Sequence, residues 1–191
     1  MKIKDIPCVI LSGGKSSRMG EDKSLLPFGD YETLIQFQYE KLSKIFSKVY
    51  ISSKEDKFDF EANLIIDTNT TFSPMVALQQ ILNQFDGDVF IITVDIPLVK
   101  TQTISLLTNL ADGHEITVAQ DEKKTHNLCG VFNSSLIPQI DDYIKDDTHR
   151  IETLLNSSQT QYIGFQDEQQ FINLNTKEEY SQACKNHNNK L

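Results

Sequence analysis

The strongest constraint on the fold is the regular alternation of short apolar runs with longer segments of helical periodicity. Cys8–Leu11 is wholly apolar, and Asp88–Val94 holds five apolar residues in seven, as is typical of strands buried on both faces. Further strands are expected at residues 49–51, 64–66, 116–119 and 126–132. Helices are expected at residues 33–46, 74–82, 106–110, 136–144, 151–155 and 176–186, the last opened by a capping box at Thr176 and Glu179. This alternation predicts a single α/β domain with three α/β/α layers and a mostly parallel sheet.

Length and composition exclude several classes of protein. The 191 residues suffice for one domain with a full hydrophobic core, and no apolar run approaches the ~20 residues of a membrane helix. The formal net charge of −9 disfavours nucleic-acid partners, whose affinity depends on neutralising phosphates. The first residues lack the apolar core of a signal peptide, so we expect a cytoplasmic protein. Cys8, Cys129 and Cys184 are scattered and odd in number, so neither a disulfide framework nor a zinc site is expected.

A glycine-rich stretch with three cations follows the first apolar run. Residues 11–23 read LSGGKSSRMGEDK. They do not form a P-loop, because Val9 stands where such a loop needs its first glycine. They do not form the dinucleotide fingerprint either, since Lys15 and Ser16 stand where that motif requires glycine. A different kind of phosphate loop is needed.

What remains is a loop suited to a triphosphate. Gly13 and Gly14 let backbone N–H groups approach an anion, while Lys15, Arg18 and Lys23 bring positive charge to the same place. The alternative is a solvated turn with scattered charges, which most charge-rich stretches are.

The whole stretch closely resembles the nucleotidyltransferase signature L-A-G-G-x-x-x-R-M-G-x-x-K, which that family also carries after its first strand. The aspartate directly before the last lysine makes it most similar to the MobA-type family, the molybdenum cofactor guanylyltransferases. The resemblance implies a Rossmann-like nucleotidyltransferase fold in which Leu11, Ser12 and Gly13 hold the base and ribose of GTP. It implies catalytic contacts of Arg18 with the phosphates and of Lys23 with the reacting α-phosphate. Gly14 and Lys15 are also expected to bind GTP.

Asp95 closes the strongest strand, in the string TVDIPLV. A carboxylate at the carboxyl end of a strand suits Mg²⁺, which is usually bound by one or two carboxylates plus substrate phosphates. The D-x-P motif of the same family matches at Asp95–Pro97, which implies that Asp95 is catalytic and binds magnesium and GTP. A simple cap or turn residue is the alternative. A rival D-x-D at Asp86–Asp88 precedes the strand, so we expect a turn at the opposite end of the sheet.

Asp67 also follows a short apolar strand. Its carboxylate is able to accept hydrogen bonds from the N1–H and exocyclic amine of guanine, and the resemblance implies a GTP contact here. The family's asparagine after the second strand is replaced in this chain, and we expect Lys54 to take its place as a GTP contact. The family's downstream P-G-P-L-A-G is also changed, to FSPMVA with Ser73 in the loop.

Residues 171–179, FINLNTKEE, resemble the family's F-x-N-x-N-T-P-E-D. The resemblance implies that Asn173 and Asn175 bind the pterin side of the acceptor, whereas a helix cap and its preceding turn are the structural alternative. His126 begins a string similar to the family's H-P-L-x-G, which implies another acceptor contact, although a lone histidine is more often structural. Arg150 either meets an acceptor phosphate or pairs with nearby acids.

The resemblance implies an enzyme that transfers GMP from GTP to molybdopterin and releases pyrophosphate, with Mg²⁺ as cofactor. Residues 1–100 would bind the nucleotide and residues 101–186 the acceptor, followed by a frayed tail at residues 187–191. We expect a monomer that makes transient contacts with proteins delivering or receiving the cofactor. The alternatives are a CTP-dependent nucleotidyltransferase, with molybdopterin or a sugar or polyol phosphate as acceptor, and a non-catalytic GTP-binding regulatory module.

Overall fold

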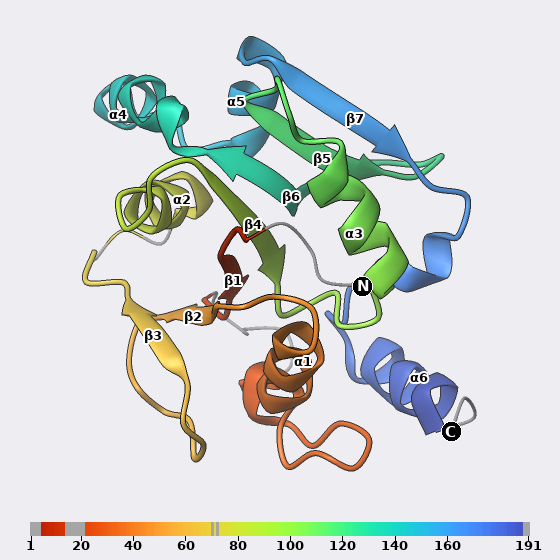
Figure 1. Cartoon of the computed structure of the whole chain (residues 1–191). Coiled ribbons are helices and arrows are strands. Elements are labelled where there is room, and N and C mark those ends of the chain that lie inside the picture. Colours follow the sequence, from red (N-terminus) through yellow and green to blue (C-terminus); the bar gives the residue numbers. More distant parts are fainter. Residues whose placement is uncertain (1–4, 14–21, 70, 72, 189–191) are drawn as a thin grey trace.

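The computed structural model describes residues 5–13, 22–69, 71 and 73–188. These residues form one seven-stranded sheet with helices on both faces (Figure 1). The strands are β1 (Cys8–Leu11), β2 (Val49–Ser53), β3 (Asn63–Ile66), β4 (Asp88–Thr93), β5 (Ile116–Gln120), β6 (Thr125–Asn133) and β7 (Thr160–Gly164). The helices are α1 (Leu34–Ser43), α2 (Pro74–Leu82), α3 (Thr101–Asn109), α4 (Ile137–Lys145), α5 (Ile151–Ser157) and α6 (Lys177–Asn188). Short 3₁₀ helices are η1 (Lys23–Leu25), η2 (Ser134–Leu136) and η3 (Glu168–Phe171).

The sheet order β3-β2-β1-β4-β6-β5-β7 places four parallel strands side by side. Because β3, β2, β1 and β4 run in the same direction, their carboxyl ends meet at one edge of the sheet. β6 is antiparallel to both β4 and β5, whereas β7 pairs with β5 in parallel. The chain leaves β1 towards β2 on one side and later returns to β4 on the other, and open α/β sheets bind ligands at such a point. The sheet is mostly parallel, as predicted.

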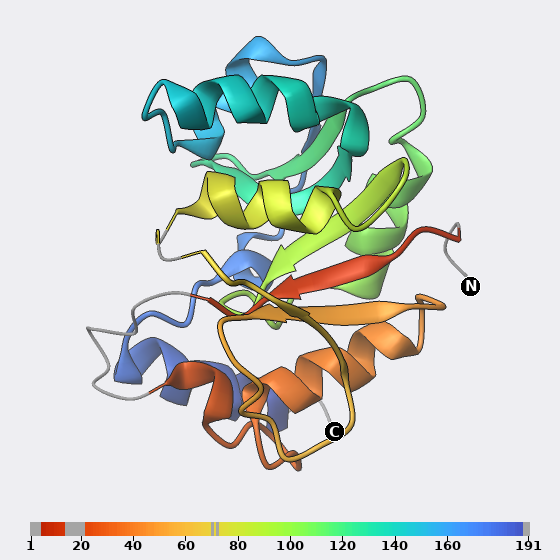
Figure 2. The ribbon, with the colours of Figure 1, turned by 90° about the vertical axis from the view of Figure 1, so that its left-hand side faces the viewer.

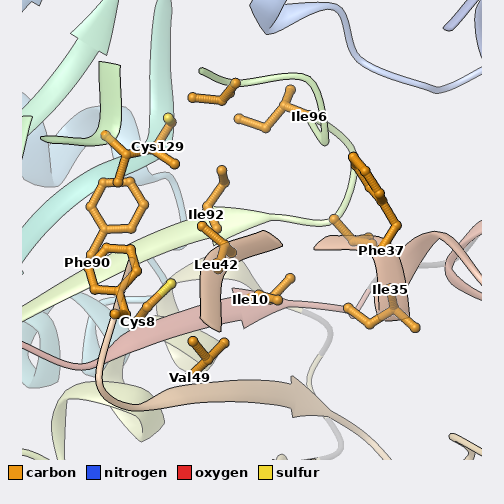
Figure 3. Close-up of a cluster of buried hydrophobic side chains, with 14 of the residues drawn as sticks. Cys8, Ile10, Ile35, Phe37, Leu42, Val49, Phe90, Ile92, Ile96 and Cys129 are labelled. Atoms are coloured by element: carbon orange, nitrogen blue, oxygen red, sulfur yellow. The ribbon is translucent and has the colours of Figure 1, made fainter. Parts of the chain in front are cut away.

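Two hydrophobic cores hold the three layers together. Along β1 the side chains alternate, so Cys8 and Ile10 join one core while Val9 and Leu11 join the other. The first core packs α1 and α3 against the sheet, and Figure 3 shows Phe90 and Ile92 of β4 and Ile10 of β1 among its side chains. The second core packs α2, α4 and α5 against the opposite face. The predicted three-layer arrangement is therefore confirmed, and Figure 2 shows α2 and α4 on one side of the sheet and α1 and α6 on the other.

Local capping explains where the helices nearest the sheet's carboxyl edge begin. The Ser73 hydroxyl accepts a hydrogen bond from the Val76 N–H (3.3 Å), and Pro74 occupies the first turn of α2. At the start of α6 the Thr176 hydroxyl accepts from the Glu179 N–H (3.1 Å), and the Glu179 carboxylate accepts from the Thr176 N–H (2.9 Å). This reciprocal pair is the predicted capping box.

The structure also departs from the expected elements. Strand β7 at the sheet edge was not predicted, because its side chains are mostly half-exposed and show no strong apolar pattern. Helix α6 continues to Asn188, so residues 187 and 188 are helical rather than frayed, since polar residues extend a helix at little cost once its buried face is packed. The expected turn before β4 is present, with Gly87 at φ 89°. Among the described residues, no helix is long and apolar enough to span a membrane.

Candidate active site

The candidate site lies where the carboxyl ends of β1 to β4 meet. A pocket of about 380 Å³, here called the first pocket, opens at this edge. It is lined by Leu11, Gly13, Ser52, Ser53, Lys54, Asp67, Ser73, Pro74, Ala77, Thr93 and Leu128. Four of the predicted GTP contacts, Leu11, Gly13, Lys54 and Asp67, are therefore in one pocket although they come from three different strand ends.

Two buried hydroxyl groups at the first pocket have no hydrogen-bond partner among the described residues. Ser53 lines the pocket and is 1% exposed, and Ser12, next to the lining residues Leu11 and Gly13, is 6% exposed. A buried hydroxyl left unpaired costs roughly 1–3 kcal/mol, so each marks a place where a ligand's polar atoms would bind favourably. The glycine-rich motif at residues 11–23 predicts that Ser12 contacts GTP. Ser53 was missed, and its position as the last residue of β2 is the signal that could have found it.

Lys54 and Asp67 form an ion pair inside the first pocket. The Lys54 Nζ lies 2.6 Å from Asp67 Oδ2 and donates to the Asn69 carbonyl oxygen at 2.5 Å. The other carboxylate oxygen of Asp67 accepts from the Asn69 N–H (3.0 Å). The carboxylate is thus fixed from both sides, and its side chain is 11% exposed. Lys54 orients Asp67 at the pocket wall, a contact that neither residue's position in the sequence reveals.

A second cluster forms around Lys23, which begins η1. Its Nζ lies 2.8 Å from Asp95 Oδ1 in the loop after β4. The same ammonium donates to Asn175 Oδ1 (3.1 Å) and to the Leu174 carbonyl oxygen (3.3 Å). Lys23 is therefore in direct contact with two other predicted site residues, Asp95 and Asn175, which are distant from it in the sequence.

The segment carrying Lys23 is braced by its neighbour Asp22. One carboxylate oxygen accepts from the Ser24 N–H (3.0 Å) and hydroxyl (2.7 Å), and the other forms an ion pair with Lys57. Burial raises the pKa of Asp22, but the hydrogen bonds from Lys57 and Ser24 outweigh it, so the pKa is lowered overall. Asp22 is therefore ionised at neutral pH and fixes the start of η1 immediately before Lys23.

A second pocket, of about 220 Å³, adjoins the first and shares Thr93 and Leu128 with it. It is lined by Thr93, Asp95, Ile96, Lys124, Thr125, His126, Asn127, Leu128, Cys129 and Asn173. Asp95 therefore lines the second pocket, two residues beyond the shared Thr93, and two of the predicted acceptor contacts, His126 and Asn173, lie in this pocket with it.

His126 is held in a fixed orientation. Its Nε2 lies 2.9 Å from Asp121 Oδ2, and its ring stacks on Phe171 at 4.1 Å between ring centres. Burial lowers the pKa of His126 and outweighs the raising effect of Asp121. The imidazole is therefore neutral at pH 7. Since a carboxylate only accepts, Nε2 carries the proton and Nδ1 is left as a hydrogen-bond acceptor.

Several predicted residues are not among the described residues that line these two pockets. Gly14, Lys15 and Arg18 lie outside the described residues. Arg150 is exposed at the start of α5. Its neighbour His149 contacts the Ser73 hydroxyl through Nδ1 (2.9 Å), so the altered loop before α2 is tied to α5.

The donor atoms near Asp95 suit a metal shared with a substrate. Within the described part of the chain, no group of three or more His, Cys, Asp or Glu side chains could hold a metal ion. Asp95 instead offers one carboxylate in the lining of the second pocket. Mg²⁺ commonly takes one or two carboxylates together with substrate phosphates and water, so Asp95 fits that mode of binding.

Comparisons with known proteins show which family the chain belongs to. The family model of the MobA-like NTP transferase domain matches residues 8–161. A molybdenum cofactor guanylyltransferase of Campylobacter jejuni is 41% identical over 184 residues, which are 94% of this chain and 96% of that protein. One from Helicobacter pylori is 31% identical over 188 residues, 95% and 92% of the two chains. The crystal structure of molybdopterin-guanine dinucleotide biosynthesis protein A from Archaeoglobus fulgidus shares the fold, with a TM-score of 0.82 and 18% identity over 96% of this chain and 100% of that one. The chain belongs to the MobA-like NTP transferase family.

Proposed function

We propose that this protein transfers GMP from GTP to molybdopterin and releases pyrophosphate. The observation that carries the proposal is the contact between Lys23 and Asp95, a cation and a carboxylate, because Asp95 lines the second of two adjoining pockets. A nucleotidyl transfer needs charged groups between two binding sites, because the attacking oxygen of the acceptor and the pyrophosphate that leaves the donor must lie on opposite sides of the α-phosphorus. The family supplies the reaction type, and the names of the bacterial relatives supply the donor and the acceptor.

The first pocket is the proposed site for the nucleoside part of GTP. Asp67 presents a carboxylate that Lys54 and Asn69 hold in place, and it accepts hydrogen bonds from the N1–H and 2-amino group of guanine. Cytosine lacks that pair of donors on one edge, so Asp67 favours GTP over CTP. The unpartnered hydroxyls of Ser12 and Ser53 supply further polar contacts for the base or ribose.

Phosphate binding is proposed at Lys23 and Asp95. Lys23 contributes a positive charge directed at the α-phosphate, and Asp95 would hold Mg²⁺, which neutralises charge on the phosphates and stabilises the departing pyrophosphate. Backbone N–H groups of the glycine-rich loop and Arg18 are proposed as further phosphate contacts. An acidic chain of net charge −9 thus binds an anion through cations gathered at one point.

The chemistry requires positioning rather than a protein nucleophile. The terminal phosphate oxygen of molybdopterin attacks the α-phosphorus of GTP as the bond to the pyrophosphate oxygen breaks. Lys23 stabilises the negative charge that develops on the transferring group, and the two pockets hold the reactants in line. His126, neutral and with Nδ1 free to accept a hydrogen bond, helps to orient the acceptor.

The second pocket is the proposed acceptor site, with His126 and Asn173 as contacts. Lys124, also in its lining, is placed to neutralise an acceptor phosphate. A third pocket of about 340 Å³ shares Lys124, Thr125 and Asn127 with the second and is proposed to hold the rest of the acceptor. That pocket is lined by Lys124, Thr125, Asn127, Glu152, Leu155, Asn156 and Tyr162.

This arrangement also supports the proposed division of the domain. Except for Leu128, the lining of the first pocket comes from residues before 100, and most of the second and all of the third come from residues after 100. We therefore propose that the first half of the chain binds the nucleotide and the second half the acceptor.

Donor selectivity provides the test. Purified protein with Mg²⁺ and molybdopterin should release pyrophosphate with GTP and far less with CTP. Asp67→Asn should reduce the preference for GTP, because an amide presents only one acceptor oxygen to the two guanine donors. A higher rate with CTP than with GTP would instead establish a cytidylyltransferase. Tight binding of GTP with no release of pyrophosphate would establish a regulatory module.

A further inference from the structure

The two asparagines of the F-x-N-x-N segment lie in different surroundings. Asn173 lines the second pocket together with Asp95 and His126. Asn175, two residues later, contacts Lys23 instead, its Oδ1 accepting a hydrogen bond from Nζ at 3.1 Å. Because the proposed role of Lys23 is at the donor nucleotide, this contact ties Asn175 to the donor half of the reaction.

The ammonium of Lys23 has three N–H donors, and three oxygen atoms surround it. They belong to Asp95 (2.8 Å), Asn175 (3.1 Å) and the carbonyl of Leu174 (3.3 Å). A lysine side chain is flexible, so its direction is set by such partners. Asp95 is also the proposed metal ligand, and an incoming metal would compete for its oxygen atoms. The other two contacts of the Lys23 ammonium, with the Leu174 carbonyl oxygen and Asn175 Oδ1, do not depend on the metal.

Those two residues are themselves anchored. The Leu174 N–H donates to the Asp95 carbonyl oxygen (2.9 Å), and the Leu174 side chain is fully buried. The Asn175 N–H donates to the Glu179 carboxylate (2.9 Å), the same group that closes the capping box of α6. A rigid support therefore extends from α6 through Asn175 to Lys23, and the segment is fastened to the loop that carries Asp95.

We propose that Asn175 is a positioning residue that directs Lys23 at the transferred phosphate, and that Asn173 alone of the pair contacts the acceptor. The proposal deepens the proposed function, since it rests on Lys23 contacting the nucleotide. It assigns the two asparagines to opposite sides of the reaction: Asn175 acts before the acceptor arrives, and Asn173 acts when it binds.

Binding of Mg·GTP in the absence of acceptor, measured by isothermal titration calorimetry, separates the two roles. Asn175→Ala should weaken GTP binding about fivefold, because a lysine side chain released from its partner must be ordered on binding. Asn173→Ala, the matched control two residues away, should leave GTP affinity unchanged and raise only the KM for molybdopterin. Asn175→Ser, whose side chain is one bond shorter but still polar, should reproduce the loss and guards against a folding defect in the alanine variant.

A double-mutant cycle with Lys23→Ala identifies the route of the effect. If Asn175 acts through Lys23, Asn175→Ala should not weaken GTP binding further once Lys23 has been removed. Additive losses, or unchanged GTP affinity in Asn175→Ala together with a raised KM for molybdopterin, would overturn the proposal. The titration of Mg·GTP binding needs no turnover. A chain that binds GTP without transferring GMP would contradict the proposed function and still test the role of Asn175, whereas a wild-type chain that does not bind GTP would contradict both.

Discussion

Lys23 and Asp95 compensate each other's charge in the ligand-free site. Their side chains are only 14% and 32% exposed, so the attraction is stronger than between two charges on the open surface. When a nucleotide and its metal bind, the Lys23 ammonium would exchange part of its contact with the Asp95 carboxylate for a phosphate, which is also negative. The Asp95 carboxylate would exchange part of its contact with the ammonium for the metal ion, which is also positive. One ion pair therefore keeps the site neutral when empty and provides both a phosphate contact and a metal ligand when filled.

Removal of the Lys23 ammonium tests its electrostatic role. Lys23→Ala should lower kcat by about 10²–10³, the usual effect of losing one preorganised electrostatic contact. Steady-state pyrophosphate release at saturating GTP measures this, with the circular-dichroism melting curve as the control for folding. Near-normal kcat in the folded variant would show that the ammonium does not stabilise the transferring phosphate.

Acid should destabilise the protein through His126. Burial holds the pKa of His126 below its ordinary value of 6.5, so the unfolded chain takes up a proton at this residue before the folded chain does. Stability is then retained above pH 6.5 and falls as the pH decreases from there towards the lowered pKa. His126→Gln should show a smaller fall in the urea midpoint between about pH 7.5 and about pH 5.5. Equal falls in the two proteins would contradict a buried neutral His126.

At the level of elements, α1 supports the loop that carries Asp95. The Gln38 amide donates to the Thr93 carbonyl oxygen (3.1 Å). One turn later the Lys41 Nζ donates to the carbonyl oxygens of Pro97 (2.8 Å) and Val99 (2.5 Å). These carbonyl groups bracket Asp95 on both sides. The position of the carboxylate therefore depends on a helix that contributes no residue to the second pocket.

The buried lysine in this support gives a second dependence on pH. Burial lowers the pKa of Lys41 from 10.5 to about 8, so between these values the unfolded chain holds a proton that the folded chain has lost. The free energy of unfolding should therefore rise with pH across this window, by up to about 1.4 kcal/mol per pH unit. The buried thiols Cys8 and Cys129, whose pKa values are raised, act in the opposite direction.

A comparison of wild type with Lys41→Met isolates the contribution of Lys41 to the pH dependence of stability. Lys41→Met keeps the thiols and removes the ammonium, so the difference in free energy of unfolding between wild type and variant should change with pH between about pH 8 and pH 10. Urea denaturation at several pH values gives this difference. A difference that stays constant across the window would mean that Lys41 titrates at its ordinary pKa.

Most elements of the fold could be predicted because each has its own local pattern. Buried parallel strands such as Cys8–Leu11 are apolar on both faces, and the helices carry a clear period. The direction of β6 could not be deduced from its own residues. It follows from the four-residue connection between β5 and β6, in which the Asp121 N–H donates to the Lys124 carbonyl oxygen (3.0 Å). So short a connection cannot cross over the sheet and must form an antiparallel hairpin.

At the scale of the whole molecule, the sequence indicated candidate site residues but not the contacts between them. Lys23 stands in the motif that follows β1 and Asp95 in the motif that follows β4, and the topology brings the ends of these two strands together. The contact of Lys23 with Asn175 joins residues 152 positions apart, and no local pattern encodes it. Ser53 was missed for a related reason, since an unpaired hydroxyl is visible only once its neighbours are in place.

The molecule places its two proposed substrates on either side of one strand end. The first and second pockets meet at Thr93 and Leu128, with Asp95 two residues beyond Thr93. The two pockets would thus bring donor and acceptor close to each other, as an in-line transfer between two bound molecules requires. The central claim is therefore that the protein moves the α-phosphoryl group, with its nucleoside, from one pocket to the other.

Following the label from GTP tests this claim most directly. With Mg²⁺ and molybdopterin, GTP labelled at the α-phosphorus should pass its label to a molybdopterin dinucleotide, and GTP labelled at the γ-phosphorus should pass its label to pyrophosphate. Both transfers should require the acceptor and should be lost in Asp95→Asn. The account would be contradicted if the α-label stayed in GTP, or appeared in free GMP at the same rate with and without molybdopterin.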